Sequence, residues 1–339
     1  MSGLAIHPES ARRLSWAAAA ALFSGFALCA VLVSLCAGSM AIEPRQVAAA
    51  LLHGGDDTAA RVVLDLRLPR VLSGFVVGGM LALAGALMQV LLRNPLAEPF
   101  VLGISGGASV FALATIALGL GGAWIHGGAL TGALISMLLV FALPRVGGEW
   151  NPMRILLTGV VVASGWGAVI SLLLAITQAA QIHTMLYWLM GDLGQARFSH
   201  WSLWLLLGAL GASLVLARGL NLLARGDLQA AALGVPVLPL RCVVYFLASF
   251  LAAGAVMEAG SIGFVGLIVP HAVRLMVGTD HRIVLPASVL GGGTLLVVAD
   301  ALARTIIAPQ QLPVGVLTAM LGVPVFLILL QTVAERQRP

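Results

Sequence analysis

Long apolar stretches make up most of the chain, and short polar links separate them. Apolar runs of about 20 residues have the length that crosses the hydrocarbon core of a membrane as a helix. Ten such segments occur, at approximately residues 15–36, 71–92, 100–118, 128–143, 155–176, 201–217, 242–258, 262–277, 284–303 and 314–333. The pattern predicts an all-α, polytopic membrane protein with about ten transmembrane helices, in which residues 1–339 form a single transmembrane domain.

Three segments, 128–143, 201–217 and 262–277, are short for a lone span. A short segment can still cross the membrane if it tilts or ends in a cavity lined by protein. The first segment follows Arg12 and Arg13, but its apolar core is longer than that of a signal peptide. We therefore expect it to be a retained helix, and ten spans place both termini on the same side.

Composition supports the membrane assignment. Hydrophobic residues make up 60% of the chain and charged residues only 9%, whereas soluble domains carry about 25% charged residues. This excludes a water-soluble enzyme, a nucleic-acid-binding protein and a disordered chain. All 18 basic residues are arginine. A phosphate-binding loop needs a lysine, so we expect no ATP hydrolysis in this chain. We also expect no catalytic residues, no bound metal and no cofactor in it.

The arginines also predict an orientation. Twelve lie in links on the side of the termini, and the excess places that side in the cytoplasm. Six lie on the opposite side against the usual bias, and these are Arg45, Arg61, Arg67, Arg70, Arg197 and Arg304.

A weak internal repeat is present. Residues 84–89 (AGALMQ) resemble residues 253–258 (AGAVME), and each follows a Leu-Pro stretch with an arginine, at 68–70 and 238–241. The two helices run in opposite directions in the predicted topology, which suggests an inverted repeat of the kind found in transporters. The alternative is coincidence, because Ala-Gly-Ala is common in alanine-rich membrane helices.

Four groups of motifs occur in order along the chain. They are RLPR at 67–70 with RNPLAEP at 93–99 and LGISGGA at 102–108; LNLLARGD at 220–227 with LGV at 233–235; GFVGLIVPHAVR at 263–274 with TDHR at 279–282; and ADALAR at 299–304 with LPVGV at 312–316 and LGVP at 321–324. Together they resemble the FecCD family of ABC-transporter permeases over residues 65–330.

The resemblance implies a permease subunit of an ABC importer in the bacterial inner membrane. It implies a homodimer that works with two ATP-binding subunits, which hold ATP and Mg²⁺, and with a periplasmic substrate-binding protein. The cargo would be a metal chelate: cobalamin, haem or an iron-siderophore. The run Tyr187–Gly191 slightly favours the cobalamin-type members.

The link at 218–241 has helical patterning interrupted by Gly226 and Gly234. Short amphipathic helices in such a link need a partner surface, and the resemblance implies docking on the ATP-binding subunit. Coupling is therefore expected from Arg225, Gly226, Asp227, Leu233 and Gly234, with a merely solvated loop as the alternative.

The resemblance also implies that Arg67, Arg70 and Arg304 dock the substrate-binding protein by pairing with its glutamates. The alternative is that these side chains sit at helix ends and pair with lipid phosphate or with Asp65.

In the family the path is lined mainly by the fifth and tenth segments. Candidate lining residues here are Gly159, Ser164, Gly167, Ser171, Val316 and Met320. Small residues also allow helices to pack closely, and the sequence does not separate packing from pore lining.

His271 follows Pro270 and lies three residues before Arg274. A histidine in a membrane segment is a candidate ligand, but we expect a structural turn in which Pro270 ends the regular helix and Arg274 reaches toward the interface.

Two other classes of function fit the sequence less well. An ion-coupled secondary transporter needs carboxylates near the middle of the membrane, whereas Asp192, Glu258 and Asp300 lie toward segment ends. A membrane-embedded enzyme would need a cluster of histidines and carboxylates inside the bilayer, and no such spacing is present.

Overall fold

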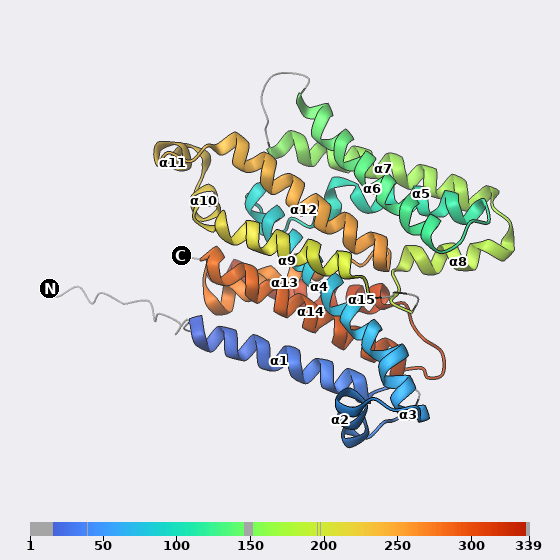
Figure 1. The fold of residues 1–339 in the computed structure, drawn as a ribbon. Helices are drawn as coiled ribbons and strands as arrows, with labels where there is room; N and C mark the ends of the chain where they lie inside the picture. The colour runs from blue at the N-terminus through green and yellow to red at the C-terminus, as the bar shows by residue number, and fades with distance from the viewer. Residues whose placement is uncertain (1–15, 39, 146–151, 195, 197, 337–339) are drawn as a thin grey trace.

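The computed structural model describes residues 16–38, 40–145, 152–194, 196 and 198–336, and the regular structure within them is entirely helical (Figure 1). The long helices are α1 (Trp16–Cys36), α4 (Leu68–Leu91), α6 (Ala123–Ala142), α7 (Pro152–Ile176), α9 (His200–Val215), α12 (Val237–Ala259), α14 (His281–Thr305) and α15 (Val314–Arg336). The shorter ones are α2 (Pro44–His53), α3 (Thr58–Arg61), α5 (Ile104–Ala117), α8 (Ala179–Met190), α10 (Ala217–Leu223), α11 (Asp227–Ala232) and α13 (Val265–Val277), with a π-helix η1 (Val62–Arg67) and 3₁₀ turns η2 (Pro99–Leu102) and η3 (Leu143–Arg145).

Each of the ten predicted segments overlaps a helix, so the all-α membrane fold is confirmed. Within the described residues, six helices are long and apolar enough to cross a membrane, and α9 with α10, bent by 64°, makes a seventh. The remaining segments correspond to the shorter apolar stretches in α5, α13 and α15. The segment count predicted from the sequence is thus compatible with the structure.

Several elements are missing from the sequence-based description. The apolar pattern does not predict α2, α8, or the extension of α4 backward through η1 and α3. These pieces are short or carry charge, so a search for long uninterrupted apolar runs passes over them. They matter because they build one end of the bundle, which we call the α3 end.

The opposite end carries α10 and α11, and we call it the α11 end. α1 begins and α15 ends there, as Figure 1 shows. The described ends of the chain therefore lie on one side, as the even number of segments predicts.

α4 is the central helix, with 89% of its membrane-spanning window buried. It packs against α12, α13 and α14. Gly78 faces Gly292 of α14, and Gly85 faces Gly266 of α13, each so closely that a Cβ would overlap the opposite backbone. Glycine at these crossings lets the backbones approach, which is how helices gain contact in lipid.

α4 and α12 also carry the two copies of the weak repeat. Both helices begin beside a Leu-Pro pair followed by a buried arginine, Arg70 in α4 and Arg241 in α12. α4 begins at the α3 end and α12 at the α11 end, so the helices run in opposite directions (Figure 1). This is the arrangement that an inverted repeat requires.

One expectation about α13 is wrong. Pro270 does not end the helix, which continues through His271 to Val277. Pro270 is the sixth residue of α13, so it removes the one N–H that would bond the Gly266 carbonyl four residues back, and the helix continues despite that loss. The expectation that Arg274 reaches toward the membrane interface is also not met in full, because the Nη2 atom of its guanidinium is buried.

Candidate functional site

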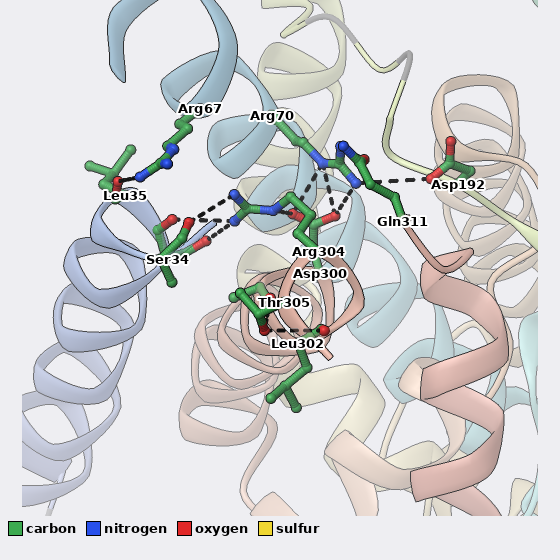
Figure 2. Close-up of polar contacts among 12 residues, drawn as sticks. Ser34, Leu35, Arg67, Arg70, Asp192, Asp300, Leu302, Arg304, Thr305 and Gln311 are labelled. Atoms are coloured by element: carbon green, nitrogen blue, oxygen red, sulfur yellow. Dashed lines mark hydrogen bonds and ion pairs between the residues drawn. The ribbon is translucent and has the colours of Figure 1, made fainter. Parts of the chain in front are cut away.

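A cluster of buried charges lies at the α3 end, where α1, α4 and α14 meet (Figure 2). Asp300 of α14 is only 2% exposed. The Arg70 Nε donates to Asp300 Oδ1 at 2.9 Å, and the Arg304 Nε donates to Asp300 Oδ2 at 3.0 Å. One carboxylate therefore holds two guanidinium groups, which come from different helices.

The third arginine of the cluster, Arg67, forms its hydrogen bonds with the end of α1 instead of with Asp300. The Arg67 Nη1 donates to the carbonyls of Leu35 and Cys36 at 2.7 and 2.9 Å, and its Nη2 donates to Met40. These are carbonyls at and just beyond the end of α1, which have no partner within the helix. Arg67 thus caps the C-terminal end of α1 and connects it to η1.

Arg304 shares this role, because its Nη2 donates to the Ser34 Oγ at 2.7 Å and its Nη1 to the Ala37 carbonyl at 3.2 Å. The Arg70 Nη1 donates to the Gln311 Oε1 at 2.7 Å. Among the described residues, the bonds of Arg67 and Arg70 go to these partners and not to Asp65. The structure thus brings together all three predicted docking residues, but as buried and bonded side chains. Their docking role stays a prediction.

A wide basin of about 2000 Å³ opens beside this cluster. Arg67, Arg70 and Arg304 form one wall, and Tyr187 and Trp188 of α8 line another part. Further lining comes from His126, His183, His200, Trp201 and Glu258. The basin combines aromatic faces with polar groups, a lining suited to a large amphipathic solute. Nowhere among the described residues do three or more His, Cys, Asp or Glu gather in a way that could hold a metal ion.

The predicted coupling link folds as two short helices, α10 and α11, at the opposite end of the bundle. Gly226 and Gly234 have φ of 122° and 79°, so glycine suits the breaks that the sequence predicts. Leu228 and Leu233 are 88% and 66% exposed. Two exposed leucines on so short a link form an apolar surface that none of the described residues covers.

The polar residues of the link divide into two kinds. Arg225 is exposed, whereas Asp227 accepts hydrogen bonds from the Arg241 Nη2 at 2.8 and 2.9 Å. The Arg93 guanidinium lies 3.7 Å from the same carboxylate. Asp227 therefore fixes α11 to the start of α12, which is a structural role that sequence reasoning did not identify.

α10 is fixed in turn to the start of α14. The Asn221 Nδ2 donates to the Asp280 Oδ1 at 2.8 Å, and the His281 N–H donates to the Asn221 Oδ1 at 2.9 Å. The hydrogen bond from Asn221 lowers the pKa of Asp280 below its usual range. Asp280 is therefore ionised at neutral pH at the N-terminus of α14, where the helix dipole favours a negative charge.

The predicted path residues lie on helices that leave much of their surface free. Only 6% of the membrane-spanning window of α7 is buried, and Ser164, Gly167 and Ser171 all lie on its exposed surface. On α15, Met320 is 66% exposed and Val316 is partly buried. Gly159 differs, because it is buried and a Cβ there would meet Val101 and Leu102. Its position fits helix packing better than path lining.

Sequence reasoning missed three members of the charge cluster: Asp300, Asp192 and Gln311. Asp300 and Arg304 stand four residues apart, the spacing that pairs side chains on one helix, so this pair could have been found. Asp192 and Gln311 approach Arg70 only through the fold, and no local pattern marks them.

Comparison with known proteins agrees with this architecture. The family model described as the FecCD transport family matches residues 26–332. The cobalamin import system permease BtuC of Halobacterium salinarum is 42% identical over 84% of this chain and 77% of its own length. The hemin transport system permease HmuU of Yersinia pestis is 41% identical over 83% of this chain and 86% of its own.

A solved structure, described as an inward-facing conformation of a metal-chelate type ABC transporter, superposes with a TM-score of 0.81 at 29% identity. The match covers 91% of this chain and 97% of that one. The family match spans nearly all of the helical bundle, including both ends described above. The chain therefore belongs to the FecCD transport family and is a membrane-spanning permease of an ABC importer.

Proposed function

We propose that this permease passes a metal chelate from a periplasmic substrate-binding protein to the cytoplasm across the bacterial inner membrane. Two copies of the chain form the path, and two separate ATP-binding subunits supply the energy. This chain itself carries out no chemistry. It offers an entrance at the α3 end, a passage between the two copies and a contact for the ATP-binding subunits at the α11 end.

The observation that carries this proposal is the contrast between the two ends of the bundle. The α3 end has the aromatic and polar basin of about 2000 Å³. The α11 end exposes Leu228 and Leu233 on a short link. A solute can enter the basin at the α3 end, and a protein partner can cover the exposed leucines at the α11 end. A vectorial importer needs both.

The cargo class is supported by the printed names of the relatives, which include cobalamin and hemin transport, and by that of the metal-chelate transporter. Cobalamin, haem and iron-siderophores are all large and amphipathic. Tyr187 and Trp188 line the basin, and flat ring systems stack on aromatic side chains. We propose a large metal chelate, with these three kinds of chelate as the candidates.

Docking of the substrate-binding protein is proposed at the rim of the basin, through Arg67, Arg70 and Arg304. All three line the basin wall. Within this cluster, the Arg70 Nη2 forms no hydrogen bond among the described residues, and we propose that it pairs with a carboxylate of the substrate-binding protein. Complementary charge of this kind accelerates association and sets orientation.

The test is reconstitution of the permease with its ATP-binding subunits in liposomes that contain ATP. Labelled cobalamin, haemin and a ferric siderophore are offered in turn, each with the transporter's own substrate-binding protein outside. We expect uptake of one of them that requires both ATP and the substrate-binding protein. Uptake driven by an imposed proton or sodium gradient without ATP would contradict the proposal.

A further inference from the structure

Arg70 is held by three groups that belong to three different parts of the chain. The Nε and Nη1 atoms donate to Asp300 and Gln311. The Nη2 atom lies 2.8 Å from Asp300 Oδ1 and 4.0 Å from Asp192 Oδ1, yet it forms no hydrogen bond among the described residues. Arg70 therefore keeps unused hydrogen-bonding capacity on the atom that faces Asp192 (Figure 2).

Asp192 lies beside this atom at the wall of the basin. Its side chain is 24% exposed, whereas that of Arg70 is 10% exposed, and both residues line the basin. At 4.0 Å the contact is an ion pair without hydrogen bonding. Asp192 thus occupies the position that a carboxylate from outside must take to reach the Arg70 Nη2.

The backbone of Asp192 belongs to a junction of helices. Its N–H donates to the Ala259 carbonyl at the end of α12 at 2.9 Å. The preceding residue, Gly191, accepts from the Gly315 N–H of α15 at 3.1 Å, and the following residue, Leu193, is fully buried. The turn that ends α8 is thereby connected to both α12 and α15.

We propose that Asp192 is an internal competitor for the docking carboxylate, and that its displacement from Arg70 signals docking to the end of α8. A carboxylate of the substrate-binding protein replaces Asp192 beside the Arg70 Nη2. Asp192 then loses its charge partner among the described residues, and the α8 turn keeps its backbone hydrogen bonds and the packing of Leu193. This inference rests on the proposed docking function. It adds a way in which docking of the substrate-binding protein changes the contacts of α8 and, through them, of α15.

The competition has a direct consequence for affinity. Removing the Asp192 charge frees Arg70 without removing any donor from the docking surface. Asp192→Asn and Asp192→Ser should therefore bind the substrate-binding protein more tightly, by roughly two- to fivefold, the range expected for the loss of one partly exposed ion pair. Asp65→Asn is the matched control. Asp65 is exposed and lines the same basin, and the substitution removes the same charge.

The experiment titrates the transporter's own substrate-binding protein onto the permease complex in lipid nanodiscs, with Arg70→Ala included. Tighter binding by both Asp192 variants than by Asp65→Asn supports the proposal. Equal affinities of the Asp192 and Asp65 variants, or weaker binding by the Asp192 variants, overturn it. If Arg70→Ala binds as the wild type does, the docking function itself fails and this inference fails with it.

A second measurement needs no partner protein. Amide hydrogen exchange over residues 188–194 should be faster in Asp192→Asn than in the wild type and unchanged in Asp65→Asn, because only the first variant releases the α8 turn from Arg70. Unchanged exchange in Asp192→Asn would show that the ion pair does not hold this turn, and would overturn the signalling part of the proposal.

Discussion

At the scale of residues, the charge cluster shows how three arginines can be buried in a membrane protein. Buried charges persist only when they are paired or hydrogen-bonded. Arg67 and Arg304 satisfy main-chain carbonyls around the end of α1, and Asp300 neutralises part of the charge. The side chains that the resemblance assigns to docking are thus also structural. A charge reversal at Arg67 or Arg70 would disturb the α3 end as well as any docking.

Asp300 is the residue on which this cluster depends most. Asp300→Asn removes the only buried carboxylate between Arg70 and Arg304. We expect a loss of about 3–5 kcal/mol in stability, the cost of leaving a buried charge without its partner. Thermal unfolding in detergent measures this. The exposed Asp65→Asn should be nearly neutral, and an equal effect of both variants would contradict the role given to Asp300.

At the scale of elements, the crossing of α4 with its neighbours depends on glycine. Gly85→Val places a Cβ in overlap with the carbonyl oxygen of Gly266 and adds two methyl groups to it. We expect a loss of at least about 1–3 kcal/mol, the usual cost of overpacking a core, seen as a lower melting temperature and lower yield. Gly208→Ala on α9 is the control, because open space surrounds that position. A stable Gly85→Val would show that α4 and α13 can separate.

The α10–α11 link provides the second prediction at this scale. Leu228→Asp with Leu233→Asp should leave the permease folded, because both side chains are exposed, but should weaken co-purification of the ATP-binding subunits at least tenfold. Leu52→Asp is the matched control: Leu52 is 79% exposed on α2, at the opposite end of the bundle. Normal assembly of the double variant would place the coupling surface elsewhere.

Asp227 is less suitable for that test than the sequence suggests. Its carboxylate joins α11 to Arg241 and Arg93, so a reversal to arginine would displace the link itself. The exposed leucines separate contact with a partner from the integrity of the link.

At the scale of the whole molecule, α7 has the smallest buried share among the candidate membrane spans, and α15 exposes Met320, Leu327 and Ile328. The membrane-spanning window of α7 is 6% buried, against 89% for the α3–α4 window. Lipid can cover an apolar helix, and so can a second copy of the chain. The proposed homodimer predicts that part of this surface lies against the same surface of a partner.

Disulfide cross-linking tests the dimer. In a background with Cys29, Cys36 and Cys242 replaced, Met320→Cys on α15 should form cross-linked dimers in membranes under mild oxidation. Val215→Cys on α9 should not, although its side chain is 84% exposed. Equal cross-linking at both positions would indicate random collision and contradict an interface at α15.

Much of the architecture was predictable from the sequence, and the candidate site only in part. The ten segments, the breaks at Gly226 and Gly234 and the link at the α11 end follow from local patterns. The burial of the arginines, the packing role of Gly159 and the continuation of α13 through Pro270 do not. The first two depend on neighbours that lie far away along the chain, and the third departs from the general rule that proline ends a helix.

The sequence by itself determined the class of fold, the helical segments and the fact that the described chain ends lie at the same end of the bundle, because lipid solvation demands long apolar helices and each helix satisfies its own backbone locally. Only the tertiary structure decided which charges meet. Arg70 and Asp300 are 230 residues apart in sequence, and Asp192 approaches Arg70 from the end of another helix. Such pairs form because a buried guanidinium must find acceptors wherever the packing of helices brings them.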